Sequence, residues 1–329
     1  MMRALILAPF SPAFLEKLRQ SIEVTYESWL ETRRLYDPDE LTLRLNNEQI
    51  DILVIESDFV FEEMFEQAAS LRFVGICRSA TNHVDIEAAT RHGVAVVNTP
   101  SRNAQAVAEH ALGLMLSLAR KIPAAHRYVA EGHWQNPVEP YLSMRGVELA
   151  GRTLGIVGLG AIGRRLAAIC AAIGMTVIAY DPYVDAAPPN VTLKSLDELL
   201  AESDFVSVHV PLTDETEAML DSRRLALMKP SAYLINATDA SVVDQDALVE
   251  ALRDKRIGGA AFDVFETHPV TPHHPLLTLD NVVLTPHLGG ATEETIERHS
   301  QMMTSDILRF LRNERPEHLV NPEVWEQRG

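Results

Sequence analysis

Cysteine is scarce in this chain of 329 residues, which contains just Cys77 and Cys170. Two cysteines cannot form a disulfide framework, so we expect both to be small buried hydrophobic residues in a reducing compartment. Basic residues are also few, because 29 Lys and Arg stand against 46 Asp and Glu and the formal net charge is −17. Such a chain repels phosphate backbones and anionic lipid, which excludes nucleic acid as an expected partner.

Long apolar runs are missing as well. The longest apolar stretch, 111–119, contains Ser117 and has about half the length that crossing a bilayer requires. The first nine residues lack the long apolar region and the small-residue cleavage site of a signal peptide, and they predict a buried strand. We therefore expect no membrane partner and a cytoplasmic location.

What remains is an ordinary globular composition, with 47% hydrophobic and 23% charged residues. The length suggests about two domains. Short apolar runs alternate with helical patterns in the first hundred residues, at 4–7, 52–55, 73–77 and 94–97. Runs this short suit buried parallel strands, so this part predicts one small α/β unit.

The second part of the chain has a more regular rhythm. Six segments resemble strands, at 153–158, 176–181, 205–210, 232–236, 259–262 and 282–285. Helical patterns lie between most of them, and together they predict a doubly wound parallel sheet. Ser195 and Glu198 form a capping box that predicts a helix start, and a final helix is expected from 292 to 311.

The segment 103–120 predicts a helix that is apolar nearly all round from Ala111. Such a helix is expected to be buried between domains or against a second subunit. The stretch that follows, with Gly132, Pro137, Pro140 and Gly146, predicts an irregular connection.

A glycine motif, G-x-G-x-x-G, stands at Gly158, Gly160 and Gly163. A strand pattern precedes it, a helix pattern follows at 164–173, and an acid, Asp181, ends the next strand 18 residues after the last glycine. This is the context of a dinucleotide site, in which the three glycines permit a tight turn, close approach to pyrophosphate and helix packing. The alternative is a glycine-rich turn without a ligand.

Asp181 is expected to accept hydrogen bonds from the adenosine ribose. A 2′-phosphate would face its charge, and the residues that follow, Pro182 to Asp185, supply no arginine to bind one. The sequence therefore predicts NAD rather than NADP as the cofactor.

Several further motifs join the glycine loop: Asn98-Thr99-Pro100, Ala106–His110, Tyr180-Asp181-Pro182, His209–Thr213, Leu234–Asn236, Phe262–Phe265 and Leu284–Gly290. With them, the chain resembles the D-isomer-specific 2-hydroxy-acid dehydrogenases, phosphoglycerate dehydrogenases among them, over nearly its whole length.

The resemblance implies two Rossmann-like domains. The NAD-binding domain would span 101–288, and a smaller flavodoxin-like substrate domain would combine 1–100 with 289–329. It also implies a homodimer built on the helix 103–119. Besides the three glycines, cofactor contacts would fall on Val107, Ala161, Ile162, Asp181, Val210, Pro211, Ala237, Asp263 and Gly289.

The chemistry of the family uses an arginine that clamps the substrate carboxylate, a histidine that exchanges a proton with the 2-hydroxyl, and a glutamate that favours the protonated histidine. His287 matches the histidine. Asp239 stands at the arginine position, and His268 stands at the glutamate position. We interpret all three residues as candidate catalytic positions.

These two departures change the expected substrate. Like charges about 4 Å apart repel by about 4 kcal/mol at an effective dielectric near 20, so Asp239 would reject a simple 2-oxo acid unless it is protonated or turned away. Arg78 or Arg102 could supply a replacement clamp for the substrate. Alternatively, the substrate lacks a carboxylate at that point and Asp239 accepts hydrogen bonds from its hydroxyl groups. Asp239 could also pair with His287 in place of the family's glutamate. Glu266 is a weaker candidate for that pairing.

Two functions stay open at this stage. The leading hypothesis is an NAD-dependent oxidoreductase that transfers hydride between NAD(H) and a CH–OH/C=O substrate of atypical structure. The alternative is an NAD-binding regulatory or interaction protein with little or no turnover. A metal site is not expected, since His273, His274 and Asp263 do not form a compact ligand set.

Overall fold

The computed structural model describes residues 1–326 and divides the chain into two units. Unit 1 combines Met1–Arg102 with the segment that begins at Thr292, and unit 2 is Asn103–Ala291. The expected boundaries of the cofactor domain, 101 and 288, differ from those of unit 2 by two and three residues.

Unit 1 is built on a five-stranded parallel sheet. From edge to edge its strands are β2 (Glu23–Tyr26), β1 (Arg3–Ile6), β3 (Ile52–Ile55), β4 (Phe73–Ile76) and β5 (Ala95–Asn98). This is the strand order of flavodoxin-like folds. The sequence predicts four of the five strands and misses β2, because the residues of this edge strand are partly exposed and form no apolar run.

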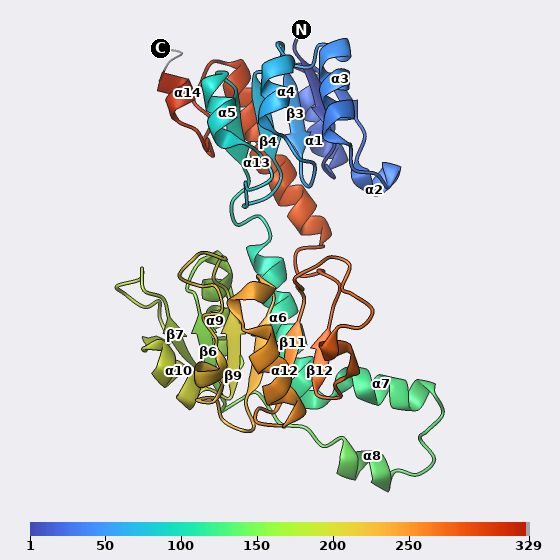
Figure 1. The fold of residues 1–329 in the computed structure, drawn as a ribbon, viewed down its shortest axis with the longest axis vertical. Helices are drawn as coiled ribbons and strands as arrows, with labels where there is room; N and C mark the ends of the chain where they lie inside the picture. The colour runs from blue at the N-terminus through green and yellow to red at the C-terminus, as the bar shows by residue number, and fades with distance from the viewer. Residues whose placement is uncertain (327–329) are drawn as a thin grey trace. The chain divides into compact units, whose positions relative to one another are not determined.

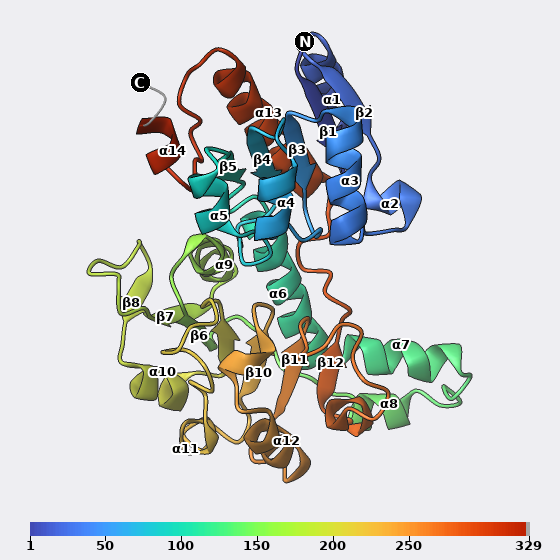
Figure 2. The same cartoon turned by 45° about the horizontal axis from the view of Figure 1, so that its top comes forward.

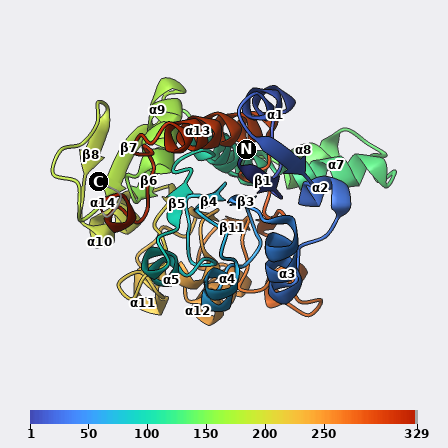
Figure 3. The ribbon, with the colours of Figure 1, turned by 90° about the horizontal axis from the view of Figure 1, so that it is seen from above.

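Helices cover both faces of this sheet (Figure 3). One face carries α1 (Pro12–Arg19) and the predicted final helix, α13 (Glu293–Leu311), while the other carries α3 (Pro38–Glu48), α4 (Glu62–Gln67) and α5 (Ile86–Arg91). Two short helices, α2 (Trp29–Thr32) and α14 (Glu323–Glu326), complete the unit. Asn321 fixes the C-terminal segment to β5, since its side chain accepts from the Val96 amide at 2.8 Å and donates to the Val94 carbonyl.

Unit 2 contains a seven-stranded parallel sheet (Figure 2). Its strands, in spatial order, are β12 (Val282–Leu284), β11 (Gly259–Phe262), β10 (Tyr233–Asn236), β9 (Phe205–Val208), β6 (Thr153–Val157), β7 (Thr176–Tyr180) and β8 (Val191–Leu193). The order reverses between β6 and β9, as in doubly wound dinucleotide-binding folds. The sequence predicts six of these strands and misses the three-residue edge strand β8.

Five helices sandwich the sheet of unit 2. On one face lie α6 (Ala104–Arg120) and α9 (Ala161–Ala172), and on the other lie α10 (Leu196–Glu202), α11 (Ser222–Leu225) and α12 (Gln245–Arg253). The predicted capping box is confirmed at the start of α10. Two turns of 3₁₀ helix, η1 (Ala240–Val242) and η2 (Pro275–Thr278), follow β10 and β11 along the chain.

The helix α6 buries part of its apolar surface within its own unit. Leu114, Met115 and Leu118 are buried against α9 and the sheet, while Leu116 is 37% exposed. The homodimer expected on this helix stays a prediction. The stretch predicted as an irregular connection is also partly helical, since α7 (Ile122–Ala130) and α8 (Val138–Ser143) lie around it (Figure 1). Neither of these two helices buries a residue.

Both cysteines are free and buried, as predicted. Burial raises the pKa of Cys77 and raises that of Cys170 to about 12, so both stay protonated thiols at neutral pH. Within residues 1–326, no helix combines the length and the apolar composition needed to cross a membrane.

Candidate functional site

The predicted cofactor and catalytic residues, apart from Val107 on α6, gather at one edge of the sheet of unit 2. They follow the carboxyl ends of successive parallel strands: Gly158 to Gly163 after β6, Asp181 after β7, Val210 and Pro211 after β9, Ala237 and Asp239 after β10, Asp263 and His268 after β11, and His287 and Gly289 after β12. Parallel pairing places these strand ends side by side, where doubly wound sheets bind their ligands.

The three glycines of the motif have different surroundings. Gly158 has a φ of +96°, and a Cβ there would lie 2.7 Å from the His209 carbonyl oxygen; a Cβ on Gly163 would lie 2.1 Å from the Gly158 oxygen. A Cβ on Gly160 would meet nothing within 4 Å. The first and third glycines therefore permit the turn and the close helix packing, while the second leaves the start of α9 open to a ligand. This cradle fits a pyrophosphate.

Asp181 stands next to this loop. One carboxylate oxygen accepts from the Leu159 amide at 2.8 Å, and the other accepts from the Tyr183 amide at 2.9 Å. The two bonds hold the acid at the end of β7 beside the glycine turn. The residues Pro182 and Tyr183 that follow are exposed, and neither is cationic.

Asp263 is the most thoroughly bound side chain of the site, with 1% exposure. Its carboxylate accepts from the Thr285 hydroxyl at 2.6 Å and from the amides of Leu288 at 2.8 Å and Gly289 at 2.7 Å. Burial opposes the charge, but His110, Thr285 and the two amides outweigh it and lower the pKa of Asp263 to about 2. One ionised carboxylate thus ties the end of β11 to the loop after β12.

This loop carries His287. The His287 amide donates to the Asp263 carbonyl at 2.9 Å and to the Thr285 carbonyl at 3.1 Å, and its φ is +57°. A left-handed conformation is uncommon for a residue other than glycine and needs support from its surroundings. Asp263 supplies it from both its main chain and its side chain, and the His287 side chain remains exposed.

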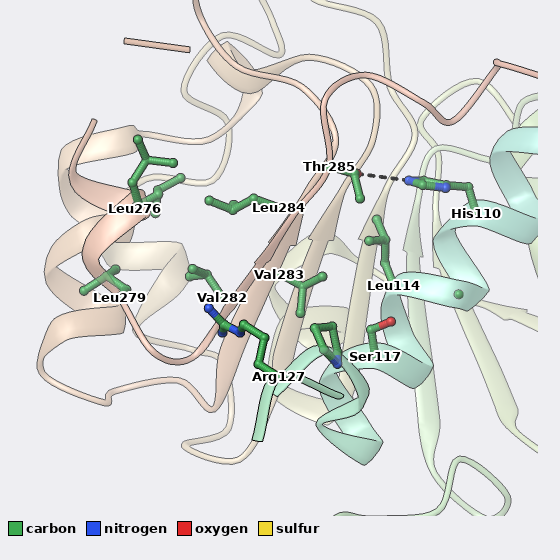
Figure 4. Close-up of a pocket in the computed structure, with 13 residues that line it drawn as sticks. His110, Leu114, Ser117, Arg127, Leu276, Leu279, Val282, Val283, Leu284 and Thr285 are labelled. Carbon is green, nitrogen blue, oxygen red and sulfur yellow. Dashed lines mark hydrogen bonds between the residues drawn. The ribbon is translucent and has the colours of Figure 1, made fainter. Parts of the chain in front are cut away.

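His110 is a residue that the sequence reasoning left without a role, although it stands in one of the quoted motifs. Its Nε2 lies 3.1 Å from the Thr285 hydroxyl (Figure 4). The same nitrogen lies 3.4 Å from a carboxylate oxygen of Asp263. It lines a cavity of about 560 Å³ between α6, α7 and β12, whose other walls are mainly apolar. In the sequence, the signal for His110 was its position in the helix pattern 103–120. In the structure, α6 turns its side chain toward Thr285, which directly follows β12.

The two departing positions lie in loops of unit 2, and His268 is the one that meets His287. His268 is exposed, and its ring centroid is 5.0 Å from that of His287. Asp239 caps η1, where its carboxylate accepts from the Ser241 amide at 2.9 Å, and its own carbonyl accepts from Asn236 Nδ2 at 2.7 Å. The Asp239 carboxylate is therefore engaged by its own turn.

Glu266 turns to a different histidine, since its carboxylate lies 3.3 Å from Nε2 of His274. His274 in turn caps η2 by accepting from the Leu276 amide. No group of three or more His, Cys, Asp or Glu side chains within the described part of the chain could hold a metal ion.

The two candidate clamp arginines belong to unit 1 and differ in their partners. Arg102 pairs with the Glu56 carboxylate and lies 2.7 Å from Nδ1 of His299, whose Nε2 is bonded to the Pro9 carbonyl. Arg78 forms neither an ion pair nor a side-chain hydrogen bond with residues 1–326, and burial lowers its pKa. Of the two arginines, Arg78 is therefore the one whose guanidinium has no partner among residues 1–326.

Comparison with known proteins gives the class. The family model "D-isomer specific 2-hydroxyacid dehydrogenase, NAD binding domain" matches residues 112–289. A glyoxylate reductase of Thermofilum pendens is 40% identical over 84% of this chain and 83% of its own. A D-3-phosphoglycerate dehydrogenase of Archaeoglobus fulgidus is 36% identical over 97% of this chain, which spans 59% of that relative. An NAD-dependent formate dehydrogenase of Staphylococcus aureus, solved with NAD, superposes with a TM-score of 0.78 at 28% identity, covering 97% of this chain and 98% of its own.

The chain belongs to the D-isomer specific 2-hydroxyacid dehydrogenase family. Its cofactor is NAD, and it is an oxidoreductase of the class that acts on CH–OH groups. The predictions of fold class, family and cofactor are confirmed.

The role of Asp263 can be tested by Asp263→Asn. The amide keeps the shape but removes the charge that three donors bind, so we expect a loss of about 2–4 kcal/mol of unfolding free energy at pH 7. Because the pKa of Asp263 lies near 2 in the folded chain and near 3.8 in the unfolded chain, its stabilisation is full above pH 4 and disappears as the pH falls toward 2. That contribution, on the order of 2 kcal/mol, should be missing from the variant in urea titrations between pH 4 and 2.

The matched control is Asp280→Asn, on an exposed carboxylate of the same region. It should change neither the stability nor its pH dependence. A variant at 263 with wild-type stability and acid response would contradict the anchoring role.

Proposed function

We propose that this chain interconverts a 2-hydroxy acid and a 2-oxo acid, with His287 as the acid–base residue. The observation that carries the proposal is the loop after β12, where the Asp263 carboxylate holds the segment of His287 at the same sheet edge as the glycine loop. NAD supplies the hydride exchange when it is bound at the glycine loop. His287 holds or releases the proton of the substrate 2-hydroxyl.

We further propose that the substrate carboxylate is clamped by Arg78 instead of a residue at position 239. Asp239 caps its own turn, and a carboxylate there repels an anion. Arg102, the other candidate, is already bound by Glu56 and His299, which suits a role in supporting the fold of unit 1. Arg78 has no side-chain partner within residues 1–326, which supports its choice as the clamp.

We propose that His268 positions His287 but does not supply the negative charge of the family's glutamate. The ring separation of 5.0 Å allows contact between the two imidazoles. An imidazole can exchange hydrogen bonds with its neighbour, but unlike a carboxylate it offers no negative charge to favour a protonated His287. The native reaction should therefore depend on pH differently from that of a relative with a carboxylate at this position.

A homodimer is proposed. Besides the helix 103–119 that the resemblance implies, a second apolar surface supports it. Exposed apolar side chains gather on and between α7 and α8: Ile122, Val129, Trp134, Val138, Tyr141 and Leu142, which are 52–72% exposed. Beside them opens the cavity lined by α6, α7 and β12. Apolar surface of this extent is typical of an interface, and a second copy of the chain would cover it.

We place the enzyme in the cytoplasm, because its two buried thiols, one in each unit, suit a reducing compartment. Its partner is a small-molecule substrate. Nucleic acid and membrane are not proposed as partners, given the net charge of −17.

NAD should be bound more tightly than NADP, by about tenfold or more, since the 2′-phosphate meets the charge of Asp181. Calorimetry with both cofactors measures this ratio. Asp181→Ser should reduce it, whereas Asp185→Asn, on an exposed acid of the same loop, should leave it unchanged. Equal dissociation constants of the wild type for NAD and NADP would refute the preference.

The double change Asp239→Arg with His268→Glu should restore the two missing family functions. We expect it to create or strengthen the reduction of glyoxylate or hydroxypyruvate by about tenfold or more, because a clamp and a carboxylate partner act on one transition state. Each single change should do less than the pair, and activity on the native substrate should fall. NADH oxidation with a panel of 2-oxo acids measures both effects.

The control for charge alone is Asp239→Asn with His268→Gln, which removes the repulsion without adding a clamp. Losing the Asp239 cap costs about 1 kcal/mol, so folding and NADH binding are checked for each variant. A folded double variant that binds NADH and reduces no 2-oxo acid would overturn the assignment of positions 239 and 268. A wild type that binds NAD(H) and turns over no hydroxy or oxo compound would favour the regulatory alternative.

The homodimer is tested by light scattering at micromolar concentration. The wild type should have twice the mass of the chain, and Val129→Asp with Leu142→Asp should shift it to the monomer, since charge would enter an apolar interface. Leu43→Asp, on an exposed leucine of α3, should leave the mass unchanged. A monomeric wild type would refute the proposal.

A further inference from the structure

The loop after β12 packs directly on the first half of α6. A Cβ built on Gly289 would lie 3.0 Å from a carboxylate oxygen of Asp263. The same Cβ would lie 3.6 Å from Val107 Cγ2 and 3.8 Å from His110 Cδ2. Val107 and His110 are three residues apart and therefore lie on one face of the helix. The loop that carries His287 is thus in contact with this face of α6.

The helix is a rigid support for the loop. Leu114, which lies one turn after His110 on the same face, is 3% exposed. Its neighbours Ala111 and Met115 are fully buried in the core that α6 shares with α9 and the sheet. Because close-packed side chains leave a helix little freedom to shift, His110 is fixed relative to the strands of unit 2.

The hydrogen bonds around His110 determine which ring nitrogen carries the proton. The Thr285 hydroxyl donates its one hydrogen to a carboxylate oxygen of Asp263, 2.6 Å away. His110 Nε2 lies 3.1 Å from that hydroxyl oxygen (Figure 4). It also lies 3.4 Å from the same carboxylate oxygen, so it faces two acceptors. We therefore assign the hydrogen to Nε2, which donates it to Thr285 and Asp263.

This donor also keeps Asp263 ionised. Burial raises the pKa of Asp263, and the hydrogen bond from His110 is the largest of the contributions that lower it to about 2. The ionised carboxylate in turn accepts from the amides of Leu288 and Gly289. The Asp263 carbonyl accepts from the His287 amide. A continuous series of contacts therefore runs from the ring of His110 to the backbone of His287.

We propose that His110 is a positioning residue for His287. Its Nε2–H completes the donors around the Asp263 carboxylate and so holds the loop 285–290 in the conformation from which His287 exchanges a proton with the substrate. The left-handed backbone of His287, with a φ of +57°, costs free energy that these contacts offset, so the loop relaxes when a donor is lost. This inference rests on the proposed function and adds a residue on which the placement of its acid–base group depends.

The first test does not depend on turnover. Hydrogen exchange of the full chain, followed by mass spectrometry, measures how often the segment 285–290 opens. His110→Leu removes the donor and keeps a similar volume, so it should raise the exchange rate of this segment about tenfold or more and leave the glycine loop 158–163 unchanged. His110→Gln, whose amide can donate from the position of Nε2, should restore most of the wild-type rate.

The second test separates the chemical step from cofactor binding. The substrate is the 2-oxo acid of a panel that the wild type reduces fastest with NADH. His110→Leu should lower kcat about tenfold or more and change the NADH dissociation constant by less than about twofold, because the glycine loop and Asp181 stay in place. His110→Gln should recover most of kcat.

Two controls match these variants. Ser117→Ala changes another residue of α6 that lines the same cavity, and His92→Leu removes an exposed imidazole from unit 1. Neither should change the exchange at 285–290, kcat or the affinity for NADH. Circular dichroism verifies that every variant is folded. Where His110→Leu does not fold, His110→Asn, whose shorter amide cannot reach Thr285, is compared with His110→Gln in its place.

The outcomes distinguish this inference from the proposed function. Faster exchange at 285–290 that His110→Gln reverses, in a chain that turns over no 2-oxo acid, would support the positioning of the loop and refute the reaction. Unchanged exchange in His110→Leu would overturn the inference, whether or not kcat falls. Faster exchange with an unchanged kcat would also overturn it, since the placement of His287 would then be independent of His110. Equal effects of leucine and glutamine would rule out the donor role of Nε2.

Discussion

The site of unit 2 depends on one buried carboxylate, that of Asp263. It accepts hydrogen bonds from the Thr285 hydroxyl and from the Leu288 and Gly289 amides, while its main chain bonds the His287 amide. These contacts join β11 to the loop after β12 and stabilise a left-handed backbone at a histidine. Because an ionised carboxylate binds such donors about twice as strongly as a neutral group, the loop is defined before any ligand arrives.

Parallel strands give this carboxylate its surroundings. In each sheet all strands pair in parallel, so every loop that follows a strand emerges at the same edge. In unit 2 this edge collects the glycine turn, Asp181 and the histidines, and in unit 1 it collects Arg78, His83 and the exposed phenylalanines. The chemistry is thereby divided between two edges of similar construction: the edge of unit 2 suits a dinucleotide and a proton carrier, and the edge of unit 1 carries the guanidinium of Arg78.

Much of the fold was predictable, because the signals are local. Strand-like segments of four to six residues marked every central strand, and a glycine motif followed by an acid identified the cofactor, since Gly158 and Gly163 answer steric demands of their immediate neighbours. The edge strands β2 and β8 were missed because their residues are half exposed and form no such runs. The helix α6 was correctly predicted, but an apolar face does not reveal which surface covers it, and much of this face packs on α9 and the sheet of unit 2.

By itself, the sequence determined the order of elements, the NAD motif and the identity of the residues that depart from the family, Asp239 and His268. Only the tertiary structure decided what those residues contact. It turned Asp239 onto its own 3₁₀ turn, bound Arg102 to Glu56 and His299, and gave the guanidinium of Arg78 no partner among residues 1–326. The reason is physical: the charge of a side chain is written in the sequence, but a partner such as His299, which lies 197 residues from Arg102, reaches it only in the folded chain.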